Sequence, residues 1–137
     1  MPDLLQAVKK QFAKDLYATQ TTGIDIEDVG EQYAKCVLHL DEKHRNAMGA
    51  VMGGVLYTLA DFAFAVAANH CVIDTVSVSG NISFCNSTKG TILYAEAQCV
   101  KNGRNNCFYT VNISDEYGVL VATVSIVGAK IKQQTTD

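Results

Sequence analysis

A single acidic residue, Asp61, stands in the longest apolar stretch of the chain, which runs from Val55 to Ala68. Removing an ionised carboxylate from water without a partner costs several kcal/mol, so a carboxylate among apolar residues needs a reason. Carboxylates with perturbed pKa values are concentrated at functional sites, where they act as bases or nucleophiles. Asp61 is therefore the first candidate catalytic residue. The alternatives are that its side chain points to solvent or caps a buried backbone group.

Two glycines, Gly53 and Gly54, precede this stretch. Without side chains they leave backbone N–H groups open to a ligand at a helix start, where the dipole adds about half a positive charge. Such groups can form an oxyanion hole. Asp61 lies about 12 Å along the helix from Gly53 and roughly 80° around it, too far for both to grip one small group. A substrate lying along the helix, or residues from across a dimer interface, would resolve this. Paired glycines also serve close packing or a turn.

The spacing of apolar residues predicts the elements that carry these groups. An amphipathic helix is predicted near the N-terminus, with Pro2 and Asp3 suited to its start. Its apolar positions recur every three or four residues and are Leu4, Leu5, Val8, Phe12 and Leu16. Residues 23–29 and 32–40 alternate between apolar and polar, which predicts two strands, and residues 41–50 are polar and turn-like. From residue 53 to residue 71 the chain is apolar on every side, which predicts a helix buried all round.

Four further segments alternate with period two and predict four strands in a meander. They are residues 75–84, 91–100, 105–113 and 119–130. Asn102-Gly103 favours a two-residue hairpin turn, and residues 86–90 and 115–118 fit longer hairpin loops. The order of elements predicts an α+β fold in which one antiparallel sheet of five or six strands wraps around the central helix. Such a sheet leaves one face or edge free, which favours pairing with a second subunit. The apolar side chains of residues 75–84 are therefore expected to pack against the helix or against a partner subunit. These side chains are Val76, Val78, Ile82 and Phe84.

Composition indicates a single globular domain, residues 1–137, with 48% hydrophobic and 18% charged residues. The net charge of −3, without a basic cluster beyond Lys9-Lys10, argues against nucleic-acid binding. Five cysteines without metal-ligand spacing indicate small buried side chains in a reducing compartment. We recognise neither a signal peptide nor an apolar stretch long enough to span a membrane, so we expect a cytoplasmic protein.

One segment matches the pattern of a known family. The pattern is N-x-x-G-x-x-x-G-G-x-x-x-x-L-A-D, formed here by Asn46, Gly49, Gly53, Gly54, Leu59, Ala60 and Asp61. It resembles the hotdog-fold acyl-CoA thioesterases of the PaaI-like group, and the resemblance extends from about Gly30 to Gly128. It implies a hotdog domain with residues 1–22 as an N-terminal helical extension. It also implies subunits paired through their sheets into homodimers or homotetramers (dimers of dimers), with active sites at the dimer interface.

The resemblance implies roles for individual residues. Asp61 falls on the catalytic carboxylate that activates water or attacks the thioester carbonyl. Gly53 falls on the glycine whose backbone N–H polarises that carbonyl, and Asn46 on an asparagine that positions the water or the thioester. The implied reaction is the hydrolysis of an acyl-CoA or aryl-CoA to the free acid and CoA, with no metal or redox cofactor.

Other residues are expected to bind the substrate. Gly54 lies beside Gly53 at the helix start, and Met52 offers an apolar surface where many relatives have a histidine. Lys89, Lys101 and Arg104 lie at loops after the central helix and are candidates for holding the CoA phosphates. Each also fits an ordinary solvated surface charge.

Three histidines, His39, His44 and His70, have no metal-ligand spacing, and we expect surface or strand positions for them rather than catalysis. Two other functions stay open. Met52 in place of the family histidine would suit an acyl-CoA-binding protein without turnover. A hotdog dehydratase or hydratase acting on a β-hydroxyacyl or enoyl thioester would need a catalytic histidine in the first turns of the central helix, where none is present.

Overall fold

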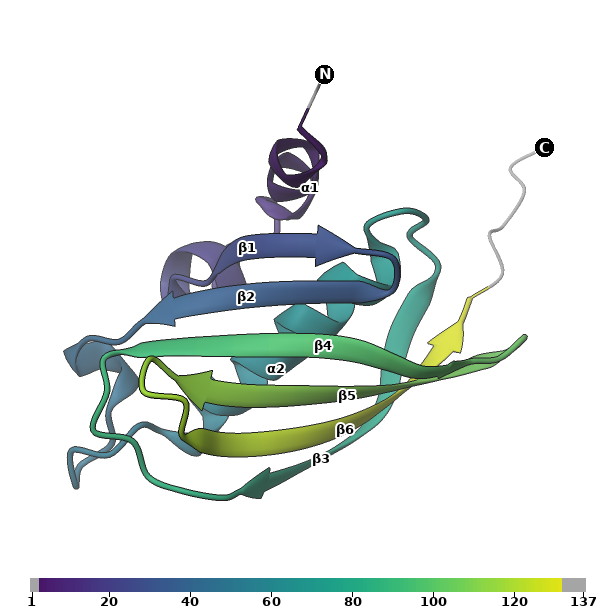
Figure 1. The fold of residues 1–137 in the computed structure, drawn as a ribbon. Coiled ribbons are helices and arrows are strands. Elements are labelled where there is room, and N and C mark those ends of the chain that lie inside the picture. The colour runs from purple at the N-terminus through teal and green to yellow at the C-terminus, as the bar shows by residue number, and fades with distance from the viewer. Residues whose placement is uncertain (1–2, 132–137) are drawn as a thin grey trace.

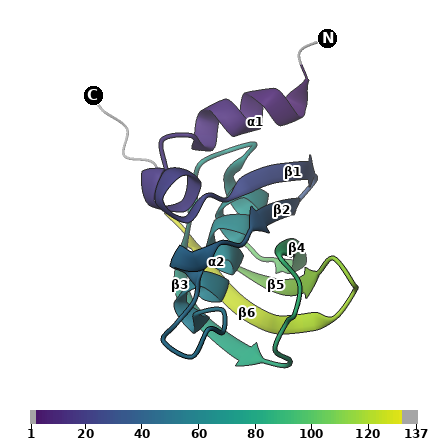
Figure 2. The same ribbon diagram turned by 90° about the vertical axis from the view of Figure 1, so that its left-hand side faces the viewer.

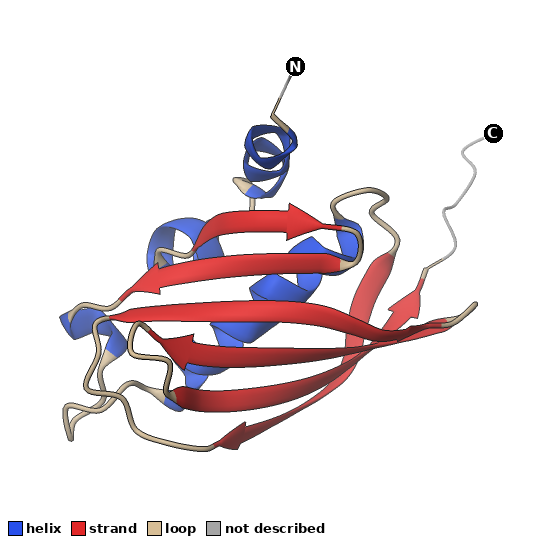
Figure 3. Cartoon of the chain, in the orientation of Figure 1, coloured by secondary structure: helices blue, strands red, loops and turns tan. Residues whose placement is uncertain are grey.

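The computed structural model describes residues 3–131, which form two α-helices and six β-strands (Figures 1 and 3). The helices are α1 (Leu4–Phe12) and α2 (Gly53–Asn69). The strands are β1 (Asp25–Gly30), β2 (Tyr33–His39), β3 (Thr75–Phe84), β4 (Ile92–Asn102), β5 (Asn106–Asp115) and β6 (Leu120–Lys130). A π-helical turn at Tyr17–Thr22 and a 3₁₀ turn at Glu42–His44 complete these elements.

All six strands belong to one antiparallel sheet with the order β1-β2-β4-β5-β6-β3. The sheet curves around α2, which contacts every strand (Figure 2). This confirms the predicted α+β architecture with a long central helix and an extra N-terminal helix. None of the helices in residues 3–131 is long and apolar enough to cross a membrane.

The core lies between α2 and the concave face of the sheet. Leu59 and Phe64 of α2 are buried against inward side chains such as Leu38 and Val111. The ring of Phe64 packs edge-on against that of Tyr109, with centroids 5.2 Å apart. Each such side chain contributes about 1.5–3 kcal/mol when it is fully buried. The strands alternate between buried and exposed positions because only one face of the sheet meets the helix.

The predicted meander is wrong for its first strand. β4, β5 and β6 are sequential neighbours, but β3 pairs with β6 at the far edge of the sheet. Both sides of β4 are occupied by β2 and β5, so residues 86–90 form a crossover between the sheet edge and β4 instead of a hairpin loop. The tight turn also differs, because Gly103 N–H donates to the Asn106 carbonyl and places Arg104 and Asn105 at its centre.

The N-terminal segment lies beside the β1 edge of the sheet. Asp3 caps α1 by accepting a hydrogen bond from Leu5 N–H, while Pro2 lies outside the described residues. The helix ends at Phe12, before the predicted Leu16, and the side chain of Leu16 is 55% exposed. Phe12 is buried and packs edge-on against Phe62 of α2, so it joins this segment to the core.

The cysteines were predicted to be buried and the histidines to lie at surface or strand positions, and each prediction holds for only some of the residues. Cys36 and Cys107 are buried as predicted, whereas Cys71 and Cys85 are exposed because they lie in connections outside the sheet. Two of the histidines are wrongly predicted. His44 and His70 are buried, and only His39, at the end of β2, is exposed. Within residues 3–131 no group of three His, Cys, Asp or Glu side chains could hold a metal ion.

Candidate active site

Asp61 lines a cavity of about 270 Å³ on the side of α2. Asp15, Leu16, Tyr17 and Ala18 of the N-terminal segment form the opposite wall of this cavity. Burial raises the pKa of Asp61, and the negative charge of Asp15 raises it further. The carboxylate accepts no hydrogen bond from a backbone group in the described part of the chain, so it caps none there. Asp61 is thus a half-buried carboxylate without a partner, facing a cavity.

The first turn of α2 leaves backbone donors free. Met52 occupies the N-cap position, where its thioether accepts no hydrogen bond from the helix. The first helical N–H to find a backbone acceptor is that of Val55, which donates to the Met52 carbonyl at 3.0 Å. The N–H groups of Gly53 and Gly54 have no acceptor among residues 3–131. This helix start therefore provides two free N–H donors at the positive end of the helix dipole, which favours binding of a negatively charged oxygen.

Gly53 also has a packing role. A Cβ atom at this position would lie 2.9 Å from Cζ of Phe84 in β3, so only glycine fits without moving that ring. A Cβ at Gly54 would meet nothing within 4 Å. The close-packing interpretation of the glycine pair is therefore confirmed for Gly53, and it coexists with a free N–H at the same residue.

Asn46 shapes the loop that leads into α2. Its Oδ1 accepts hydrogen bonds from Met48 N–H at 3.0 Å and Ala50 N–H at 3.1 Å. Gly49, between them, has a φ of +81°, a left-handed conformation that favours glycine. The amide nitrogen of Asn46 makes no hydrogen bond in residues 3–131, so it alone is left to contact a ligand.

A second cavity, of about 410 Å³, opens beside Gly53. Phe84 and residues 85–88, which begin the crossover to β4, form much of its wall. Asp115 anchors this wall, because its carboxylate accepts a 2.7 Å hydrogen bond from the hydroxyl of Thr88. That bond, followed by bonds from the Val119 and Tyr117 N–H groups, holds the pKa of Asp115 below its usual range.

Within one chain the predicted site residues do not converge. Asp61 and Gly53 line different cavities. Met52 is 54% exposed at the helix start and belongs to the Gly53 end. Lys89 lies next to Thr88 before β4, whereas Arg104 lies after it. Because β4 has 11 residues and is therefore roughly 35 Å long, these two cations sit at opposite ends of the sheet (Figure 1). One chain cannot use both on a single ligand.

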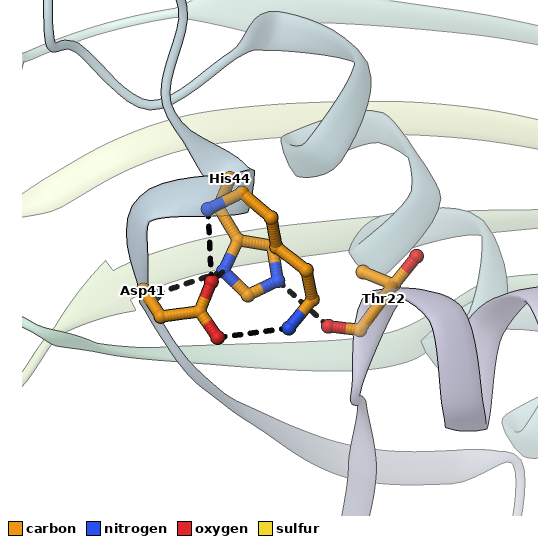
Figure 4. Close-up of polar contacts among 4 residues, drawn as sticks. Thr22, Asp41 and His44 are labelled. Atoms are coloured by element: carbon orange, nitrogen blue, oxygen red, sulfur yellow. Dashed lines mark hydrogen bonds and ion pairs between the residues drawn. The ribbon is translucent and has the colours of Figure 1, made fainter.

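His44, whose carbonyl accepts from Met52 N–H at the start of α2, is buried, although a surface or strand position was predicted for it. Its Nδ1 accepts from Asp41 N–H at 3.0 Å, and its Nε2 lies 2.7 Å from the carbonyl of Thr22 (Figure 4). Asp41 Oδ1 in turn accepts from Lys43 N–H at 3.0 Å. The spacing Asp41-x-x-His44 is that of a capping box, with histidine in place of glutamate. The capping-box spacing is the feature of the sequence that could have predicted a fixed, hydrogen-bonded position for His44.

Comparison with known proteins identifies the family. Residues 48–122, more than half of the chain, match the Thioesterase superfamily. The chain belongs to the thioesterase superfamily. The PaaI protein of E. coli, from the phenylacetic acid degradation operon, has a solved structure that is similar over 98% of this chain and 100% of its own, with 26% identity and a TM-score of 0.81. The expected hotdog fold and PaaI-like grouping are therefore confirmed.

Two further relatives are informative. A protein of Archaeoglobus fulgidus named "Putative esterase" is 27% identical over 120 residues, 87% of this chain and 78% of its own. A hypothetical thioesterase of Streptococcus pneumoniae, solved with coenzyme A, has a TM-score of 0.81 and 22% identity, covering 92% of this chain and 98% of its own. With 22% identity, the similarity to the Streptococcus pneumoniae protein shows a shared fold.

Proposed function

We propose that this thioesterase-superfamily protein is an acyl-CoA thioesterase that hydrolyses its substrate to a free acid and CoA. The observation that carries the proposal is Asp61, an unpartnered carboxylate with a raised pKa that faces a cavity on the central helix. A raised pKa suits a carboxylate that must take a proton during the reaction.

In the proposed reaction a water molecule adds to the thioester carbonyl carbon while Asp61 takes its proton. The carbonyl oxygen gains negative charge, which the N–H of Gly53 stabilises at the positive end of α2. The C–S bond then breaks, and the proton passes to the CoA sulfur. Direct attack by Asp61 would instead form an acyl-enzyme anhydride that water hydrolyses. The free amide nitrogen of Asn46 would position the water or the thioester.

The separation of Asp61 from Gly53 favours a site built from two copies of the chain. The two residues are about 12 Å apart along α2. The Asp61 cavity, of about 270 Å³, is smaller than the roughly 300–1,000 Å³ typical of ligand sites, and the Gly53 cavity, of about 410 Å³, is near the lower end of that range. In the proposed homodimer Asp61 of one protomer faces Gly53 of its partner. A tetramer, as a dimer of dimers, would repeat the same unit.

Strand β3 supports this dimer as its pairing edge. It is a ten-residue edge strand with exposed Val76, Val78 and Phe84. Long apolar edges are normally covered by another element or by a second chain. Phe84 lies against Gly53, so pairing at this edge would bring the helix starts of both protomers to the interface.

The CoA part of the substrate is proposed by analogy with the fold. The Streptococcus pneumoniae thioesterase was solved with coenzyme A and shares this fold. Met52 and Gly54 would contact the thioester end, and Lys89, which follows the cavity-lining Thr88 in the chain, would hold a phosphate. Arg104 could contribute only from the partner subunit, because it lies at the other end of β4.

The experiment that tests this function measures thiol release from short, medium, long and aromatic acyl-CoAs. Wild-type protein is compared with Asp61→Asn, and we expect kcat to fall by about 10²–10⁴-fold in the variant. Cys71 and Cys85 are exposed thiols, so an enzyme-only blank is needed with any thiol reporter. Wild-type turnover that persists unchanged in Asp61→Asn would overturn the assigned role of Asp61.

One observation favours a second candidate function. Met52 at the N-cap can neither donate nor accept a strong hydrogen bond, which suits a protein that binds acyl-CoA without turnover. Calorimetry distinguishes the two functions, because a binding protein would bind acyl-CoA without releasing thiol. Its affinity would also be unchanged by Asp61→Asn.

A further inference from the structure

We propose that the N-terminal turn, residues Leu16–Thr22, forms a specificity-determining wall for the acyl group beside Asp61, and that His44 is the positioning residue that holds this wall in place. The inference rests on the proposed thioesterase function and deepens it. It concerns a segment and a histidine to which the proposed mechanism gives no part.

The wall faces Asp61 directly. Leu16, Tyr17 and Ala18 line the same cavity as Asp61. Leu16 is 55% exposed and Tyr17 is 67% exposed, so beside Asp15 the side of the cavity away from α2 carries apolar surface that contacts little else. An acyl chain or aromatic ring attached to a carbonyl at Asp61 would lie against these side chains. Their shape would therefore select among acyl groups.

The turn is a closed unit that ends at Thr22. The N–H groups of Gly23 and Ile24 both donate to the carbonyl of Ala18, at 3.1 and 3.0 Å, so the backbone folds back on the wall. Thr22 itself is buried. A displacement of Thr22 would therefore move Ala18 and the side chains next to it.

His44 connects this turn to the start of α2. Because Nδ1 accepts from Asp41 N–H, the ring hydrogen is on Nε2 and is donated to the Thr22 carbonyl at 2.7 Å (Figure 4). The carbonyl of His44 accepts from Met52 N–H at 2.9 Å. One buried residue, with 2% of its surface exposed, thus ties the Asp61 wall to the helix start that carries Gly53.

Two substitutions separate the two hydrogen bonds of the ring. His44→Asn keeps an acceptor near the Nδ1 position but cannot reach Thr22. His44→Gln keeps a donor near the Nε2 position and can maintain the connection to Thr22. His70→Asn is the matched control, because His70 is also buried and its Nε2 lies 2.6 Å from the Gly30 carbonyl, but it lies at the opposite end of α2. Tyr17→Ala removes part of the wall itself.

The readout is the ratio of kcat/KM for octanoyl-CoA or benzoyl-CoA to kcat/KM for acetyl-CoA, whose acyl group is too small to reach the wall. We expect His44→Asn and Tyr17→Ala to change this ratio by about tenfold, since a misplacement of about 1 Å can cost up to a hundredfold. His44→Gln and His70→Asn should leave it within about threefold of wild type. Hydrogen exchange should increase at residues 16–22 in His44→Asn and not in His44→Gln.

The proposal is overturned if all three histidine variants change every substrate equally, because a purely structural role would do that. It is also overturned if His70→Asn shifts the ratio as much as His44→Asn, or if exchange at residues 16–22 does not respond to His44→Asn. A wild-type protein without turnover on any acyl-CoA would refute the proposed function and this role with it. That failure is visible before any variant is made, so the two failures are distinguishable.

Discussion

An active site shared between two protomers predicts that two inactive variants regain activity in a mixed dimer. Asp61→Asn removes the proposed base. Gly53→Pro removes the proposed oxyanion donor and places proline at the first helical position, which proline favours. Its matched control is Gly53→Ala, which adds a Cβ that meets the same Phe84 ring and keeps the N–H.

The size of the recovery follows from the symmetry of a dimer. Loss of a general base costs about 10²–10⁴-fold, and loss of one oxyanion donor about 10²–10³-fold, so each parental dimer should retain about 1% of wild-type activity or less. A mixed dimer has two sites. One combines both substitutions and is inactive, while the other combines the native Asp61 with the native Gly53. The mixed dimer should therefore show about half of wild-type activity.

The assay needs dimers of defined composition. The two variants are co-expressed with different affinity tags, mixed dimers are isolated by two successive affinity steps, and thiol release is compared with both parental dimers. Sedimentation gives the mass of each species. Activity of the mixed dimer at the parental level would refute a site shared across the interface, as would a wild-type chain that is active as a monomer. Loss of activity in Gly53→Ala equal to that in Gly53→Pro would show that packing at this position matters more than its N–H.

Three further outcomes are expected. Because Asp15 raises the pKa of Asp61, Asp15→Asn should move the acid limb of the kcat/KM profile to lower pH, and an unchanged or upward shift would contradict the assignment. Since the folded-state pKa of Asp61 is raised, its contribution to stability is full in acid and is lost as the pH rises through that pKa. Asp61→Asn should therefore increase Tm at pH 7, and the gain should disappear in acid; a lower Tm at pH 7 would argue against it. Gly128→Ala would place a Cβ 2.7 Å from Cys107 Sγ and 2.8 Å from Thr75 Cγ2, so urea unfolding should show a loss of about 1–3 kcal/mol, and a change below about 0.5 kcal/mol would exclude tight packing there.

The elements with strong local signals were predictable from the sequence. The central helix begins at Gly53 as expected, because the glycine pair separates a polar loop from a long apolar run. β3 has the predicted bounds, Thr75–Phe84, and the remaining strands differ by a few residues. Asp61 could be recognised because a carboxylate in such a run is costly wherever the helix packs.

Strand order and long-range contacts were not predictable in the same way. All four C-terminal strands alternate, so the pattern gives no preference for β3 pairing with β6 over β4. The position of Leu16 and Tyr17 over Asp61 depends on how the N-terminal segment folds back over more than 40 residues of chain. The separation of Lys89 from Arg104 likewise requires knowing that β4 runs straight between them.

The exposure of α2 links the fold to the proposed dimer. A helix that is apolar on every side was expected to be buried all round, yet one stripe along it is only partly covered. The stripe has helical spacing and consists of Gly54, Thr58, Asp61, Ala65 and Ala68. The N-terminal turn flanks it on one side, and Tyr57, whose hydroxyl lies over Gly80 of β3, flanks it on the other. A second copy paired along β3 would approach from this second side. In the proposed dimer the same contact would cover the stripe and complete the active site. The reason is that Asp61, the unpartnered carboxylate, lies in the part of α2 that a single chain leaves partly exposed.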